Sequence, residues 1–246
     1  MAMPLIDDHS LDHAFYPDSD DEPMAESVLQ AEVIRTLIMG FQRLYLGRPD
    51  VVVVGDAFWY PVKGQPKVVL APDTMVVVDL PSPPDIRTMG SYRQFEFGGR
   101  VALAVEVLSP SNTAAEMRRK RQFYEQHGAA EYWQYDPESA SLEVWVRQGD
   151  ALVSTAVPPH GLISPATGVR VGVADGMLAV HDPGTDRRWL MLAGEAALIV
   201  EAEAQAARLQ TEAARVHGEA ARIRAEAARR VAELEAQLAA LSGKAT

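Results

Sequence analysis

Two carboxylates in apolar, strand-like segments are the residues of this chain best suited to chemistry. Asp73 follows Pro72 and precedes a run of apolar residues, and Glu106 lies within the nearly continuous apolar segment 101–108. A charge in such a strand costs free energy unless another group pairs with it. If the two strands are neighbours, the carboxylates converge at one edge of the sheet, where they could bind a hard divalent cation such as Mg²⁺. The alternative is a pair of strand-end carboxylates that cap loops or bridge to Arg.

A predicted helix downstream supplies the context that favours the chemical interpretation. Glu116, Lys120 and Tyr124 are spaced by four residues and therefore share one helical face. Tyr124 and the nearby Met117 indicate that this face turns toward the sheet, where Lys120 could orient an attacking water or stabilise developing negative charge. The alternative is a surface pair between Glu116 and Lys120, which is worth only about 0.3–0.5 kcal/mol.

A sheet and two helices are needed to hold these side chains. Apolar residues at helical spacing predict a first helix that begins at Pro23 and ends before Gly47. Ser111 or Thr113 can cap a second helix, and Thr113 with Glu116 has the spacing of a capping box, so this helix is expected to run from there to Gly128. β-Branched and aromatic runs predict strands at residues 51–60, 68–70, 75–80, 101–108, 131–136, 141–147 and 151–156. With a surface loop at residues 81–99, these elements predict an α/β or α+β domain.

The composition excludes several classes of site. The 246 residues include no Cys, so neither a disulfide framework nor a thiolate metal site can form. The six His show no metal-ligand spacing, Ser109 has no evident His–Asp partners, and no Gly-rich phosphate loop occurs. No apolar run approaches the roughly 20 residues that span a bilayer, and no secretory signal is evident, so we expect a cytoplasmic protein without a membrane partner.

The charge is unevenly distributed along the chain. The net charge of −11 argues against a strong generic affinity for nucleic acid, but nine acids and no Lys or Arg fall within the first 32 residues. The rest of the chain is nearly neutral and contains one dense basic run, residues 118–121. We expect residues 1–22 to form a mobile acidic leader, residues 23–193 a folded domain and residues 194–246 a helical tail.

The tail is rich in Ala, Glu, Arg and Leu. Its apolar residues recur at steps of three and four from Leu209 to Leu241, which is a heptad seam with one stutter. This pattern predicts a coiled coil that joins copies of the chain through residues 200–241. Because Ala occupies many seam positions, the alternative is a lone helix or one folded onto its own domain.

The order of these motifs resembles the Uma-type family of restriction endonucleases, whose nuclease fold belongs to the PD-(D/E)XK superfamily. The resemblance rests on Pro72-Asp73, Glu106 to Ser111, Lys120 with Tyr124, Gly128, Glu131-Tyr132-Trp133 and Asp136-Pro137, and more loosely on Ser19 to Glu26 and Gly55 to Tyr60. It implies a restriction-endonuclease-like mixed sheet flanked by helices and a Mg²⁺-dependent phosphodiesterase site.

The resemblance also assigns roles to particular residues. Asp73 and Glu106 match the metal-binding carboxylates. The superfamily lysine would stand at Leu108, and in this family its counterpart is on the helix, which makes Lys120 the candidate. Glu116 stands where the family often has Asp, and Glu26 matches a glutamate that many superfamily nucleases carry on their first helix.

Two hypotheses follow from the sequence. The first is a metal-dependent endonuclease that cleaves DNA with Mg²⁺, or with Mn²⁺ in its place, in which Asp73 and Glu106 bind the metal, Lys120 positions the water and Tyr124 supports Lys120. The second is a non-catalytic module that keeps the nuclease fold and acts through its coiled-coil tail. The net acidity and the missing in-strand lysine favour the second hypothesis, whereas the intact Asp73, Glu106 and Lys120 favour the first.

Overall fold

The computed structural model describes Tyr16, residues 27–85, residues 87–191 and a set of positions between 205 and 230. The chain divides into two compact units, Met1–Leu192 and Ala193–Thr246. Of the predicted leader, only Tyr16 is among the described residues. Its ring is 4% exposed and packs edge-on against Tyr60, and its hydroxyl accepts a hydrogen bond from the Gly64 amide at 2.6 Å. Tyr16 is therefore docked against the first unit.

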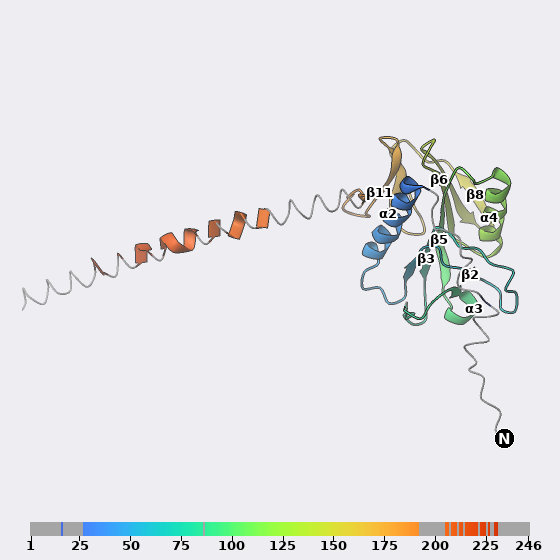
Figure 1. Cartoon of the computed structure of the whole chain (residues 1–246), viewed down its shortest axis with the longest axis horizontal. Helices are drawn as coiled ribbons and strands as arrows, with labels where there is room; N and C mark the ends of the chain where they lie inside the picture. The colour runs from blue at the N-terminus through green and yellow to red at the C-terminus, as the bar shows by residue number, and fades with distance from the viewer. Residues whose placement is uncertain are drawn as a thin grey trace, which may run out of the picture. The chain divides into compact units, whose positions relative to one another are not determined.

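A six-stranded mixed sheet forms the centre of the first unit (Figure 1). Its strands, in spatial order, are β1 (Val52–Val54), β3 (Thr74–Val78), β5 (Arg100–Val107), β6 (Glu131–Asp136), β7 (Ser141–Gln148) and β8 (Ala151–Thr155). Within this sheet β5 and β6 pair in parallel and the other neighbours pair antiparallel, and the helix α4 (Ala114–Gln126) makes the crossover between β5 and β6. The mixed α+β architecture predicted from the sequence is confirmed.

Helices cover both faces of this sheet, and Figure 1 shows α2 (Val28–Leu44) and α4 on opposite sides of it. Side chains of β5 alternate between the two faces: Leu103 and Val105 pack in the cluster that contains α2, whereas Ala104 packs in the cluster that contains Tyr124 of α4. This alternation places Glu106, two residues after Ala104, on the face that α4 covers.

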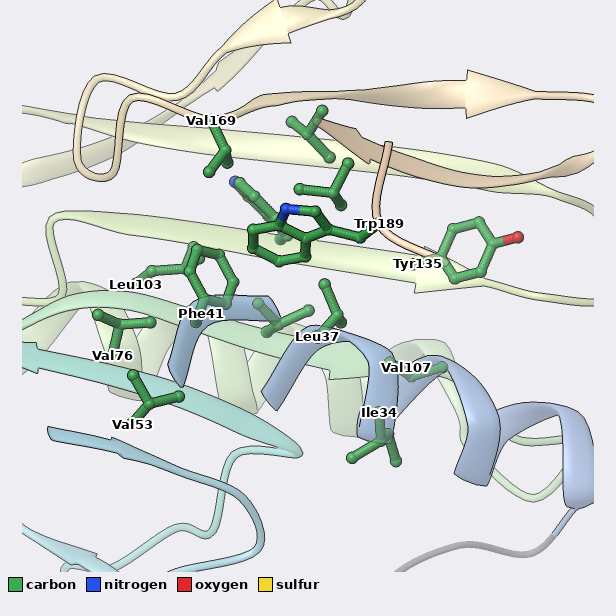
Figure 2. Close-up of a cluster of buried hydrophobic side chains, with 14 of the residues drawn as sticks. Ile34, Leu37, Phe41, Val53, Val76, Leu103, Val107, Tyr135, Val169 and Trp189 are labelled. Carbon is green, nitrogen blue, oxygen red and sulfur yellow. The ribbon is translucent and has the colours of Figure 1, made fainter. Parts of the chain in front are cut away.

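The α2 face is closed by a second, smaller sheet. It consists of β9 (Leu162–Ile163), β10 (Arg170–Ala174) and β11 (Met177–His181), in the order β11-β10-β9. Figure 2 shows Trp189, which follows this sheet, over Phe41 and Leu37 of α2, and the Phe41 and Trp189 ring centroids are 4.8 Å apart. A Cβ on Gly40 would lie 2.1 Å from the Trp189 ring, so a glycine is required inside this helix.

Several predicted elements differ from those observed. The expected strand 51–60 is split, because the chain bends at Gly55 and at Asp56, whose φ is +52°, and its second half becomes β2 (Trp59–Tyr60). Residues 68–70 form only one bridge, between Leu70 and Trp59. The expected loop 81–99 contains β4 (Tyr92–Arg93), which pairs with β2, and the short helix α3 (Gln94–Phe97).

The first helix also starts later than the sequence predicts. Ser27 is the N-cap of α2, and its hydroxyl accepts a hydrogen bond from the Gln30 amide at 3.1 Å. Pro23 is therefore not the first residue of this helix. Val28, expected on its apolar face, is 83% exposed.

The described positions of the second unit between 205 and 230 are helical. Leu209, Val216 and Ile223, seven residues apart, are 65%, 50% and 67% exposed. Arg215 pairs with Glu212 and Glu219 along the helix. The predicted seam from Ala227 onward lies outside the described residues, and the coiled coil stays a prediction. Nowhere in the described part of the chain is a helix long and apolar enough to cross a membrane.

Candidate metal-dependent active site

Glu106 lies at the end of β5 and is the centre of the candidate site. Its side chain is almost fully buried, at 2% exposure, between the sheet and α4. Lys120 Nζ donates a hydrogen bond to Glu106 Oε2 at 2.9 Å, and the Tyr124 hydroxyl donates to Oε1. The structure therefore brings together Glu106, Lys120 and Tyr124, as the spacing on the helix predicts.

The start of α4 fixes which of its faces meets the sheet. Thr113 Oγ1 accepts a hydrogen bond from the Glu116 amide at 3.2 Å, and Glu116 Oε2 accepts one from the Thr113 amide at 3.4 Å, which completes the predicted capping box. Met117, one turn after Thr113, is buried. Tyr124 is fully buried, and its ring lies parallel to the Trp59 ring with 6.2 Å between the ring centroids. These contacts hold the face that carries Lys120 against β5.

Asp73 approaches Glu106 from the neighbouring strand. The antiparallel register pairs Thr74 with Val105, so Asp73 stands opposite Glu106. The Val107 amide donates to Asp73 Oδ2 at 2.6 Å, while no described residue donates a hydrogen bond to Oδ1. The chain also passes closely behind this point, because a Cβ on Gly55 would lie 2.9 Å from the Asp73 carbonyl oxygen.

The two carboxylates carry more negative charge than their surroundings compensate. Burial raises the pKa of Asp73 well above its ordinary value of 3.8, and the neighbouring charge of Glu106 raises it further. Burial also raises the pKa of Glu106, although Lys120 and the Tyr124 hydrogen bond act in the opposite direction. Burial lowers the pKa of Lys120, but the negative charges of Glu106 and Asp73 raise it by more, so the pKa lies above its ordinary value of 10.5. The ammonium group therefore stays protonated.

This donor set fits a hard divalent cation. The described residues contain no group of three or more His, Cys, Asp or Glu side chains that could hold a metal. Two carboxylates suffice for Mg²⁺, which is usually held by one or two of them together with waters and substrate phosphates. A second positive charge beside Lys120 would offset the repulsion between Asp73 and Glu106, and Asp73 Oδ1 is a free acceptor for it among the described residues.

Sequence reasoning missed Gln30, which links α2 to the site. Its Nε2 donates a hydrogen bond to the carbonyl of Val107 at 2.8 Å, and the amide of the same residue donates to Asp73. Gln30 is 6% exposed and precedes the buried Ile34 by one helical turn. A polar residue on the apolar face of the predicted helix is the pattern in the sequence that could have pointed to it. Asp56, exposed at the bend after β1, was likewise missed, and its charge contributes to raising the pKa of Asp73. Glu26, the residue singled out on this segment, lies outside the described residues.

A second buried glutamate, Glu131 at the start of β6, lies on the opposite face of the sheet. Both of its oxygens accept hydrogen bonds from neutral donors: Trp133 Nε1 at 2.6 Å, Ser164 Oγ at 2.7 Å and the Ala166 amide at 3.2 Å. No described cation pairs with it. Glu131 therefore joins β6 to the segment before β10, and its contacts indicate a structural role.

Comparison with known proteins places this chain in a family. No curated protein matches the sequence. A crystal structure from Anabaena variabilis ATCC 29413, described as a "putative nuclease", is 12% identical and has a TM-score of 0.45 over 60% of this chain and 77% of the other. The Uma2 family, described as "Putative restriction endonuclease", matches residues 22–180, which is well over half of the chain. The chain therefore belongs to the Uma2 family.

Proposed function

We propose that the protein is an endonuclease that hydrolyses DNA phosphodiester bonds with Mg²⁺, or with Mn²⁺ in its place. Membership of the Uma2 family supports a nuclease. The observation that carries the proposal is the buried Glu106 carboxylate, which is bound by Lys120 and Tyr124 and faces a second carboxylate, Asp73. A purely structural carboxylate would not need a second one beside it, because each raises the free energy of ionising the other.

Asp73 and Glu106 are the residues that would hold the cation. When bound, Mg²⁺ supplies a lowered pKa for a coordinated water and charge compensation for a phosphoryl group. Asp73 is oriented by the Val107 amide, and Glu106 by Lys120 and Tyr124, so both carboxylates are pre-positioned by the strands and the helix. From the α2 side, Gln30 donates a hydrogen bond to the carbonyl of Val107, the residue whose amide binds Asp73.

Lys120 acts as a cation and a hydrogen-bond donor in this proposal. Because its pKa is raised, it cannot accept a proton from the attacking water near neutral pH. Its ammonium instead orients the water and stabilises negative charge that develops on the phosphoryl oxygens. Tyr124 is a positioning residue, since its hydroxyl is bound to Glu106 in the buried part of the site.

The direct test is cleavage of a panel of DNA substrates with Mg²⁺ or Mn²⁺ by the wild type and by Glu106→Gln. The substitution removes a negative ligand at nearly constant volume, so we expect cleavage to fall by about 10²–10³-fold or more while the fold is kept. Equal rates for the two proteins would remove Glu106 from the catalytic site. An inert wild type would instead support the rival hypothesis, a non-catalytic module that keeps the nuclease fold.

A second proposal concerns assembly through residues 200–241. It is favoured by Leu209, Val216 and Ile223, which lie two helical turns apart and are exposed within their own chain. A homo-oligomer formed along this seam would bury them and bring two candidate active sites together, as the cutting of two strands requires. Deletion of residues 200–246 should lower the mass per particle in light scattering without unfolding the first unit, whereas equal numbers of chains per particle would contradict the proposal.

A further inference from the structure

Two cavities flank α4, one on each side of the helix. The first, here called the Lys67 cavity, has a volume of about 580 Å³ and lies between α4 and the segment from Lys67 to Leu70. It is lined by Lys120 of the candidate active site and by Arg119, Phe123 and His127. The second, the Arg118 cavity, measures about 300 Å³ and is lined by Arg118, Arg121 and Trp145.

We propose that the Lys67 cavity binds an unpaired nucleotide of the DNA strand, next to the phosphodiester that lies at Glu106 and Lys120. This inference rests on the proposed nuclease function for the identity of the strand. Lys120 belongs both to the cavity wall and to the Glu106 cluster, so a strand held at the active site continues into the cavity. The volume lies within the roughly 300–1,000 Å³ of typical ligand sites.

The charges along the cavity suit the phosphates of such a strand. Lys67 and Arg119 are exposed, and neither forms an ion pair within the part of the chain that the structure describes. Glu116 is the one acid among the described residues that line the cavity, and it accepts hydrogen bonds from Asn112 Nδ2 and the Thr113 amide at the start of α4. Two free cations therefore flank Lys120, which is the arrangement that binds successive phosphates.

The apolar part of the cavity suits a base. The Phe123 and His127 rings are in contact, with 4.5 Å between their centroids, and Val68 and Leu70 line the opposite side. Burial lowers the pKa of His127, so its ring is neutral at physiological pH and can stack without a charge. Unpaired bases bind to aromatic side chains within cationic grooves, whereas a paired base keeps its faces within the duplex stack.

The Arg118 cavity lacks these features. The Arg121 guanidinium lies over the Trp145 ring, 5.0 Å from its centroid, so this cation and this ring already form a cation–π interaction with each other. Glu143 adds a negative charge to the wall. Arg118 and Arg119 are thus adjacent, exposed and on one helix, yet they line different cavities, which makes Arg118 the matched control for Arg119.

The experiment measures binding of full-length protein to a fluorescein-labelled single-stranded oligonucleotide and to its duplex, by anisotropy, with Ca²⁺ in place of Mg²⁺ to prevent cleavage. Lys67→Ala and Arg119→Ala should each weaken single-strand binding about threefold to tenfold, and Arg118→Ala should leave it unchanged. Phe123→Leu should weaken single-strand binding about tenfold and duplex binding much less. His127→Ala serves the same purpose if Phe123→Leu unfolds, and circular dichroism monitors folding.

The outcomes separate this inference from the proposed function. Equal losses for Arg118→Ala and Arg119→Ala would mean generic electrostatics and would overturn the inference. The inference also fails if the wild type cleaves DNA while the cavity variants bind the single strand normally, although the nuclease proposal then stands. A wild type that binds the single strand through the cavity but cleaves nothing would support the inference and contradict the nuclease proposal. Absence of all DNA binding would contradict both.

Discussion

Glu106 and Glu131 are both buried glutamates on adjacent parallel strands, but their surroundings differ in kind. Glu131 on β6 faces the second sheet, and its partners are an indole, a hydroxyl and a backbone amide. Glu106 on β5 faces α4, where it is bound by a protonated lysine and a tyrosine and stands opposite Asp73. Burial raises the pKa of both.

The difference shows how a structural carboxylate can be told from a candidate ligand. Neutral donors compensate the lost hydration of Glu131, and its two oxygens are fully used within the protein. At Glu106 the protein adds a second carboxylate and leaves Lys120 in the wall of an open cavity, with a side chain 21% exposed. A buried charge that the protein itself does not balance, next to a cavity, indicates a site that binds an ion or a ligand.

The largest expected effect is that Glu131→Gln lowers stability but not activity, whereas Glu106→Gln lowers activity but not stability. Glu131→Gln should lower the free energy of unfolding by about 1–3 kcal/mol, because the new amide nitrogen faces buried donors, and should leave cleavage within a few-fold of wild type. Glu106→Gln should do the reverse, because Lys120 can turn toward solvent or Asp73. Cleavage assays and thermal melts on both variants measure the effect. Loss of activity in both, or in neither, would remove the distinction.

The pH dependence sharpens the same comparison. Since burial raises the pKa of Glu131 above 4.5, its contribution to stability is present below that pH and is lost as the pH rises through the raised value. The stability advantage of the wild type over Glu131→Gln should therefore shrink as the pH rises from the acidic side. Denaturant titrations across this range check the sign, and an advantage that grows with pH would show that the neutral donors outweigh burial.

Lys120 and Tyr124 should give intermediate effects on activity. Lys120→Ala removes the cation and should reduce cleavage by about 10²-fold, whereas Tyr124→Phe removes one hydrogen bond and should cost about tenfold. Both groups lower the pKa of Glu106, so each variant should also move the acidic limb of the pH–rate profile to higher pH. Partial rescue by Lys120→Arg is the control, and a lowered rate with an unmoved profile would indicate a structural role.

The smallest expected effect is at the start of α4. Thr113→Ala removes the side-chain half of the capping box and should cost about 1 kcal/mol of stability. Because Lys120 lies almost two turns further along and is held by packing at Met117 and Tyr124, cleavage should fall only slightly. A chemical-denaturation curve measures the first quantity. A large loss of activity at full stability would show that the cap itself positions the site.

The sequence predicts the core strands well because their apolar runs are long and bounded by turns. Strand β6 is observed with the predicted bounds, and α4 begins after the predicted cap at Thr113. Elements that depend on distant partners were not predictable. β4 is two residues long and exists because it pairs with β2, and the bend at Asp56 needs a positive φ that its neighbours do not signal.

The candidate site was predictable where spacing along one element decides the outcome. Lys120 and Tyr124 share a helical face, and a buried face must meet the sheet, so their approach to Glu106 follows from the pattern. Gln30 was not found, because its partner, the Val107 carbonyl, is 77 residues away in the chain. The Lys67 cavity was equally hidden, since it forms between a loop and a helix that the sequence does not place together.

Calorimetric titration with Mn²⁺ and Mg²⁺ measures directly whether Asp73 and Glu106 form a metal site, because it needs no knowledge of the DNA substrate. We expect one metal site in the wild type that is lost in Asp73→Asn and in Glu106→Gln and is kept in Glu131→Gln. We also expect weaker metal binding as the pH falls, since the raised pKa values of Asp73 and Glu106 let protons compete with the metal. Equal binding by all four proteins, or none by the wild type, would contradict the assignment of Asp73 and Glu106 as the metal site.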